Sequence, residues 1–303
     1  MGRKSRAGKE DPRNLIIFIL LLVVSVETYI IYTHLPRKAE SKAVKKKIVF
    51  APAIAKKESP AQLAPSPLIE PVPIPPPLKK PIVGRIAIII DDWGYSKHCS
   101  ELGEIKDPVT VAVLPELPHS REIAQCAHDQ NKEVMLHLPL EPHKNLDRYP
   151  EDYIIKTSMN KSRVEALLKS AIDSVPFVDG VNNHMGSKAT EDRRLMTIVF
   201  TKLKERKLFF VDSYVTSSSI CRPLAKQMKI LFAQRDVFLD NENKRPYIEN
   251  QFAQLAREAR KKGYAVGIGH DRELTLQIIK EQTALLKDQG FAIVTVRNLI
   301  QGN

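Results

Sequence analysis

From Arg85 to the end of the chain, short apolar runs alternate with amphipathic segments. This alternation is typical of βα units, in which parallel strands are joined by helices. Because it repeats across residues 84–303, it favours a β/α barrel of seven or eight parallel strands over an open sheet. The phosphate-binding patterns GxGxxG and GxxxxGK[ST] are absent from the sequence, which argues against the common open-sheet nucleotide folds.

The apolar runs place the expected strands, and the amphipathic segments place the expected helices. Strands are predicted at residues 86–90, 109–114, 133–136, 180–183, 208–211, 229–232, 264–268 and 291–296. Helices are predicted at residues 120–130, 161–174, 192–207, 247–262 and 272–288. Gly263 and Gly290 follow two of these helices, where a glycine C-cap is expected.

The N-terminal part of the chain reads as a membrane anchor and not as globular sequence. Residues 15–32 are apolar except for Ser25, Glu27 and Thr28, which reaches the lower length limit for a transmembrane helix. The basic residues of segment 1–14 predict a cytoplasmic tail, so that the rest of the chain is exported. The alternative is a cleaved signal peptide, but no A-x-A-like cleavage site lies around Val24 to Tyr32.

Residues 33–83 are rich in Pro, Ala and Lys, and this composition predicts a disordered linker. A linker of ~50 residues reaches from about 40 Å as a coil to about 150 Å as a stiff rod. The expected product is a single-pass protein of the inner membrane, with its domain at 84–303 in the periplasm or outside.

The charge of the chain is concentrated before the domain. Residues 1–83 hold 15 Lys/Arg and 6 Asp/Glu, a net +9, which leaves +3 of the total +12 for residues 84–303. The domain therefore gives no electrostatic reason to expect a nucleic-acid partner. The three cysteines form no CxxC pair, and their odd number favours buried free thiols, with a Cys99–Cys126 bridge as the alternative in an oxidising compartment.

Most of the predicted strands end in ionisable side chains. The carboxyl ends of the strands of a parallel barrel meet at one mouth, where reactive residues lie. One such residue would be read as a helix cap or a surface group, but a set on different strands indicates a site. The strand-end residues are Asp91, Asp92, His137, His184, Asp212, Arg235, Asp236 and His270.

Asp, His and Glu side chains in such a set can bind a divalent ion through nitrogen and oxygen atoms, and Zn²⁺ is the expected ion. Glu141 stands four residues after His137 and is a second candidate ligand on that segment. The pair Asp91 and Asp92 offers one carboxylate for the metal and one for a proton. These features predict metal-assisted hydrolysis.

Four segments resemble the divergent polysaccharide deacetylases, an offshoot of the NodB-type carbohydrate esterases. The segments are IIIDDWGY at 88–95, HLPLEP at 137–142, VNNHMGS at 181–187 and GIGH at 267–270. The resemblance covers residues 84–303 and implies a NodB-like barrel.

The resemblance also implies roles for individual residues. Asp91 corresponds to the general base, Asp92 and His137 to metal ligands, and His270 to the general acid. The chain departs from the family pattern at Glu141, where a second histidine ligand is expected. His184, in place of an Arg-Pro-Pro-Tyr-Gly pattern, can supply the missing ligand, with Glu141 coordinating weakly or supporting the ligands.

The implied reaction is removal of acetyl groups from an N- or O-acetylated glycan, and the exported location suits an envelope polymer such as peptidoglycan. Candidate substrate-binding residues at the mouth are Trp93, Asp212, Arg235 and Asp236. Trp93, the only tryptophan, is expected either to stack on a sugar or to pack beneath its loop. The alternative function is a non-catalytic envelope protein that binds a glycan or a cell-wall partner on the same fold.

Overall fold

The computed structural model describes residues 81–96, 99–144 and 149–302. The predicted tail at 1–14, the predicted transmembrane helix at 15–32 and nearly all of the predicted linker at 33–83 lie outside these residues. Within the described part of the chain, no helix has the length and apolar character needed to cross a bilayer.

The domain is built on one nine-stranded sheet in which every strand pairing is parallel. The strand order is β6-β5-β4-β3-β2-β1-β8-β7, and β9 pairs with the first half of β1. The strands are β1 (Gly84–Trp93), β2 (Thr110–Val113), β3 (Glu133–Leu140), β4 (Val178–Met185), β5 (Phe209–Asp212), β6 (Phe232–Gln234), β7 (Val237–Phe238), β8 (Tyr264–His270) and β9 (Phe291–Val294).

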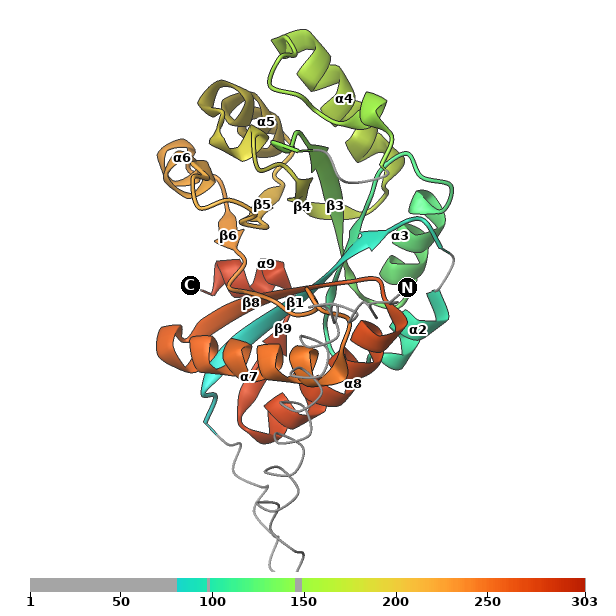
Figure 1. Cartoon of the computed structure of the whole chain (residues 1–303), viewed down its shortest axis with the longest axis vertical. Helices are drawn as coiled ribbons and strands as arrows, with labels where there is room; N and C mark the ends of the chain where they lie inside the picture. The colour runs from blue at the N-terminus through green and yellow to red at the C-terminus, as the bar shows by residue number, and fades with distance from the viewer. Residues whose placement is uncertain (1–80, 97–98, 145–148, 303) are drawn as a thin grey trace, which may run out of the picture. The chain divides into compact units, whose positions relative to one another are not determined.

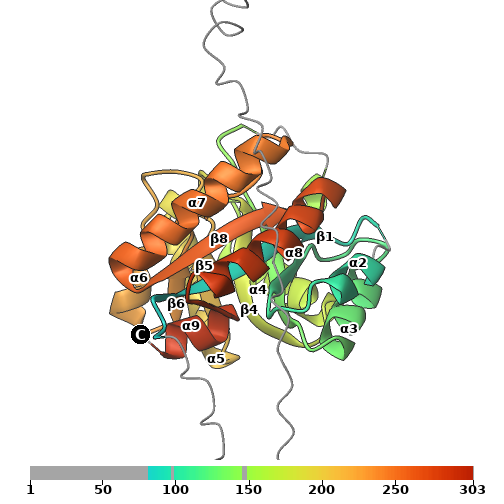
Figure 2. The same ribbon diagram turned by 90° about the horizontal axis from the view of Figure 1, so that it is seen from below.

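Helices surround the curled sheet (Figures 1 and 2). Helices α7 and α8 lie side by side across β8 and β9, and α4, α5 and α6 follow one another along the other part of the sheet. The helices are α2 (Cys99–Glu104), α3 (Ser120–Asp129), α4 (Lys161–Ser174), α5 (Arg193–Glu205), α6 (Cys221–Met228), α7 (Arg245–Lys262), α8 (Glu273–Asp288) and α9 (Val296–Gln301), with short 3-10 turns η1 (Glu151–Tyr153) and η2 (Ala189–Glu191).

Alternation along the strands divides the apolar side chains between two cores. On β1, Ile86, Ile88 and Ile90 belong to the large core between the sheet and the helices. Ala87 and Ile89 belong instead to a smaller core on the concave face of the sheet. Helix α9 adds Val296 and Leu299 to this inner core. The start of α9 is held by Glu133, the first residue of β3, which accepts hydrogen bonds from two of its backbone N–H groups.

The predicted β/α barrel is confirmed as a curled half-barrel of parallel strands. The described residues form nine strands where seven or eight were expected, and in this part of the chain β6 and β7, at the two ends of the strand order, do not pair with each other. The prediction at 229–232 overlaps β6 only at Phe232, because α6 extends to Met228 and Lys229 forms its left-handed C-cap. The two-residue β7 is too short to give a periodic signal in the sequence.

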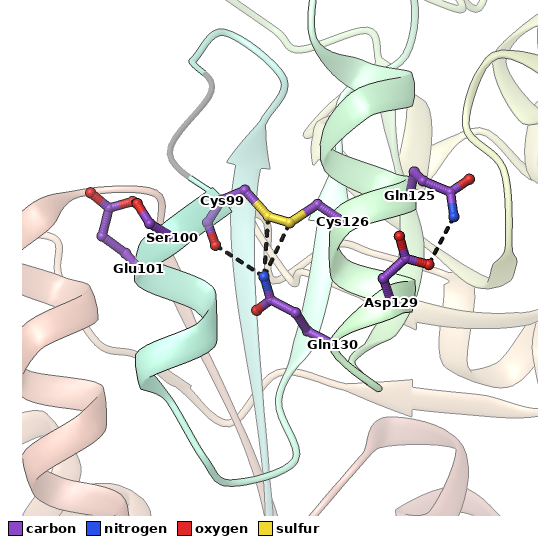
Figure 3. The surroundings of a disulfide bond; sticks show 7 residues. All are labelled: Cys99, Ser100, Glu101, Gln125, Cys126, Asp129 and Gln130. Carbon is purple, nitrogen blue, oxygen red and sulfur yellow. Dashed lines mark hydrogen bonds between the residues drawn. A yellow bond between two sulfur atoms is a disulfide. The ribbon is translucent and has the colours of Figure 1, made fainter.

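Cys99 and Cys126 form a disulfide that joins the start of α2 to α3 (Figure 3). Their Cα atoms are 6.3 Å apart, and the Gln130 side-chain amide donates to both sulfur atoms. Cys221 is a buried free thiol. The expectation of free thiols is therefore wrong for Cys99 and Cys126, because the two helices pack together in a way that cysteine spacing does not reveal.

Breaking this bridge is expected to destabilise the domain. The disulfide closes a loop with a sequence separation of 27 residues, and a cross-link of this length stabilises a fold by about 2–4 kcal/mol, chiefly by restricting the unfolded chain. Urea unfolding of the Cys99→Ser/Cys126→Ser protein should show a midpoint well below that of the wild type. Equal midpoints, or three reactive thiols in the denatured unreduced wild type, would contradict the bridge.

Candidate active site

The candidate site lies on the concave face at the carboxyl ends of the strands. Successive side chains of a strand point to opposite faces, so residues two apart share a face. Each of three site residues therefore continues the line of an inner-core residue on its own strand. Asp91 lies two residues after Ile89 on β1, His137 two residues after Met135 on β3, and His270 two residues after Ile268 on β8, so each shares the concave face with that core residue.

Asp92 would point to the opposite face from Asp91 if β1 continued regularly. Instead, its φ is 67°, in the left-handed region, and the register between β1 and β2 shifts between Ile90 and Trp93. Residues other than glycine adopt this conformation at a cost of about 1–3 kcal/mol, and such residues often mark functional sites. Here the irregularity brings the Asp92 carboxylate to His137, which Asp91 also approaches at 3.7 Å, and to His184.

Asp92, His137 and His184 form a compact group of three candidate ligands. Asp92 Oδ1 lies 3.2 Å from His137 Nε2 and 3.1 Å from His184 Nδ1, and the two nitrogens are 3.1 Å apart. Ligand atoms bound to one ion at about 2.1 Å are separated by ~3.0–3.4 Å. The triangle therefore fits a divalent ion in both its dimensions and its two-nitrogen, one-oxygen donor set.

The two aspartates have opposite ionisation properties. Burial raises the pKa of Asp91, although His137 and His270 partly oppose this effect. Burial also acts on Asp92, but the rings of His137 and His184, whose nitrogens lie 3.2 and 3.1 Å from its Oδ1, outweigh it and hold the pKa of Asp92 well below its ordinary value. Asp92 is thus suited to remain an anionic ligand, whereas Asp91 is suited to exchange a proton.

His270 is paired with Asp240, a fully buried aspartate that follows β7. His270 Nδ1 lies 2.7 Å from Asp240 Oδ1, and Asp240 Oδ2 accepts hydrogen bonds from the His270 backbone N–H and the Thr275 hydroxyl. Burial lowers the pKa of His270, but the hydrogen bond and the charge of Asp240 outweigh it, so that the net pKa is raised. A histidine with a raised pKa carries a proton more readily near neutral pH and is suited to act as an acid.

A model of the divergent polysaccharide deacetylase family matches residues 88–300. The chain belongs to this family. Two curated relatives are also similar to this member of the divergent polysaccharide deacetylases. This chain is 34% identical over 207 residues to the uncharacterized protein YibQ of Escherichia coli (strain K12), and the alignment covers 67% of this chain and 64% of that protein. It is 34% identical over 197 residues to an uncharacterized protein of Haemophilus influenzae, covering 65% of this chain and 70% of that protein.

The fold of this member of the divergent polysaccharide deacetylase family is shared with a solved structure. The crystal structure of the uncharacterized protein ATU2773 from Agrobacterium tumefaciens C58 superposes with a TM-score of 0.67 at 23% identity, over 71% of this chain and 89% of that chain. The aligned part spans only 64% of the length of the E. coli relative.

Glu141, the position at which this member of the divergent polysaccharide deacetylase family departs from the family pattern, does not join the ligand group. Its Oε2 accepts hydrogen bonds of 2.6 Å from both the backbone N–H and the hydroxyl of Thr157. Its Oε1 lies 2.8 Å from Lys188 Nζ. Glu141 thus ties together the loops that follow β3 and β4, and His184 occupies the third corner of the triangle.

The four residues suggested as substrate contacts have different positions. The side chain of Trp93 has no exposed surface and belongs to the core between sheet and helices, which favours packing over sugar stacking. Asp212 lies two residues after Phe210 on β5 and therefore on the same face, which packs against the helices. It accepts a hydrogen bond from the Ser219 hydroxyl. Asp236 accepts from the Val266 backbone N–H, near the start of β8, and pairs with Lys262 at the end of α7.

Arg235 contacts Phe238, whose ring also neighbours the ring of His270. Its guanidinium lies 3.6 Å from the ring centroid of Phe238, and the centroid of the His270 ring lies 6.0 Å from that of Phe238. Two of its nitrogens donate to the backbone oxygens of Ser213 and Tyr214. Arg235 therefore fixes the loop after β5 beside Phe238.

Two polar residues of the site were not found from the sequence. Asp240 follows the apolar residues Val237, Phe238 and Leu239, so the strand-end rule would have found it had that run been taken as a strand. Asn182 lies two residues before His184 on the same face of β4, and this spacing was the available signal. It is fully buried and hydrogen-bonds to both Asp91 and His137.

Proposed function

We propose that this chain is a metal-dependent hydrolase that removes acetyl groups from an envelope glycan. The observation that carries the proposal is the triangle of Asp92, His137 and His184, with Asp91 and His270 beside it on neighbouring strands. The membership of the chain in the divergent polysaccharide deacetylase family supports an acetylated glycan as the substrate class.

The side chains divide the reaction between them. Asp92, His137 and His184 would hold the ion, which when bound supplies a Lewis acid for the acetyl carbonyl. Asp91 takes a proton from the attacking water. Its side chain is buried, and it is in register with His270 across β1 and β8. His270, whose Nδ1 is held by Asp240, donates a proton from Nε2 to the departing nitrogen or oxygen.

Acetate release tests the proposal directly. The full chain, purified in detergent and supplied with Zn²⁺, Co²⁺ or Mn²⁺, is expected to release acetate from N-acetylated or O-acetylated glycan fragments. Release should stop after chelation and return when the ion is restored. A chain that binds glycan and ion but releases no acetate with any of the three ions would instead support the non-catalytic binding function.

The proposed location is the outer side of the inner membrane. Support comes from the apolar segment 15–32, its basic flank and the linker at 33–83. The disulfide is also consistent with an oxidising compartment, where such bridges form and persist.

A reporter that is active only in the periplasm, fused after Asn303, should therefore be active, because the basic flank keeps the N-terminus in the cytoplasm. The same reporter fused before residue 15 is the control and should be inactive. Activity of a cytoplasm-specific reporter at the C-terminal position would refute the proposed location.

A further inference from the structure

Asn182 lies between the proposed base and a proposed metal ligand. It is in register with His137 across β3 and β4, and its side chain is fully buried. Its Nδ2 donates to Asp91 Oδ1 at 2.8 Å, and its Oδ1 lies 2.8 Å from His137 Nδ1. A third contact, at 3.4 Å from Nδ2 to the Ser213 hydroxyl, holds the amide from another side.

These contacts determine which way the amide points. An ionised carboxylate can only accept hydrogen bonds, so the Nδ2 group, the only donor of the Asn182 side chain, must face Asp91. The Oδ1 atom is then left facing His137, and it can only accept. His137 Nδ1 must therefore carry a hydrogen when the ring is neutral.

The hydrogen on Nδ1 determines the state of the other ring nitrogen of His137, Nε2. With its hydrogen on Nδ1, neutral His137 has a lone pair on Nε2, the atom that faces Asp92 Oδ1 and His184 Nδ1. Only a nitrogen without a hydrogen can bind a metal ion. We infer that Asn182 is a positioning residue that fixes the metal-binding tautomer of His137 and, through the same amide, the orientation of Asp91.

This inference rests on the proposed function and adds a positioning residue to its metal site. It also explains why an amide side chain occupies position 182. An aspartate would place another carboxylate beside Asp91 and could not donate to it. A leucine of similar size would offer neither contact. An asparagine supplies one donor and one acceptor on the same side chain, as the two neighbours require.

The tautomer can be measured in the full chain without metal. Long-range ¹H–¹⁵N NMR of the histidine rings, at alkaline pH where the ring is neutral, should show His137 with its hydrogen on Nδ1. In Asn182→Ala this preference should be lost. A wild-type His137 with its hydrogen on Nε2 would overturn the inference, whether or not any variant folds.

Metal affinity gives a second measurement. Titration of the metal-free full chain with Zn²⁺ is expected to show about 10–100-fold weaker binding in Asn182→Ala, the usual effect of removing a group that orients a ligand. The matched control is Asn183→Ala: Asn183 is also buried but contacts Met185 O and the Ser213 backbone N–H. Unchanged affinity in Asn182→Ala, or an equal loss in both variants, would overturn the inference.

These results are separable from the test of the proposed function. A chain that shows the Nδ1 tautomer and the loss of affinity specific to Asn182→Ala, yet releases no acetate, supports the inference while the proposed function fails. A chain that releases acetate but shows the Nε2 tautomer overturns the inference alone.

Discussion

Replacing Asp91 with asparagine is expected to lower acetate release by about 10²–10⁴-fold, the usual contribution of a positioned proton-transfer group. Asparagine keeps an oxygen that can accept from Asn182 but cannot take a proton from water. Zn²⁺ binding should therefore remain close to that of the wild type. Steady-state acetate release and Zn²⁺ titration of the same preparation measure the two effects separately.

Asp212→Asn is the matched control for this substitution. Asp212 is also buried at the end of a strand, but it faces the helices and bonds with Ser219. Its replacement should affect stability more than turnover, leaving acetate release per folded molecule within a few-fold of the wild type. If Asp212→Asn abolishes release and Asp91→Asn does not, the assignment of the base is wrong.

The pH dependence follows from the directions of the two pKa shifts. Asp91 must be ionised to act as a base, and burial raises its pKa above the ordinary 3.8. The rate should therefore fall as the pH drops through that raised pKa. His270 must be protonated to act as an acid, and Asp240 raises its pKa above 6.5. The rate should also fall as the pH rises through this second pKa.

The variants assign the two limbs of this profile, because a bound ion can contribute a limb of its own. Asp91→Asn should flatten the acid limb, and His270→Ala the alkaline one. Asp240→Asn removes the negative charge that raises the pKa of His270, so it should move the alkaline limb to lower pH. An alkaline limb that is the same in all these proteins would show that His270 is not the group responsible.

The parts of the site that lie on long strands could be predicted from the sequence. Asp91, His137 and His270 each continue a regular alternation on a strand with a clear apolar run. The parallel arrangement then brings their ends to one edge. The same rule also selected Asp212 and Asp236, because a strand-end position alone does not say which face of the sheet a side chain takes.

The features that the sequence did not predict depend on local backbone geometry and on contacts between residues distant in sequence. The position of Asp92 follows from a left-handed residue and a register shift, neither of which has a periodic signal. Asp240 belongs to a segment whose strand has only two residues. The disulfide depended on the packing of α2 against α3. In each case the determining contact is made by the folded sheet and not by neighbouring residues in the chain.

Replacing His184 with alanine is expected to abolish most Zn²⁺ binding, with an affinity loss greater than the 10–100-fold typical of a group that only supports a ligand. His184 Nδ1 is one corner of the triangle, 3.1 Å from both Asp92 Oδ1 and His137 Nε2. Two protein ligands alone would remain after its removal, fewer than the three of the usual catalytic zinc site. Titration of the metal-free full chain measures the loss, and circular dichroism reports whether the fold is kept.

Glu141→Gln is the decisive control, because it separates the two residues that the sequence left as alternatives for the last ligand position. Glu141 is held by Thr157 and Lys188, so its neutral replacement should weaken the contact between these loops and leave Zn²⁺ affinity within a few-fold of the wild type. The reverse pattern, with full occupancy in His184→Ala and loss in Glu141→Gln, would mean that Glu141 leaves Lys188 and takes the third position. The order of the two affinities therefore decides which residue takes the place of the second histidine ligand expected at position 141: His184 on the next strand, β4, or Glu141 itself in the loop after β3.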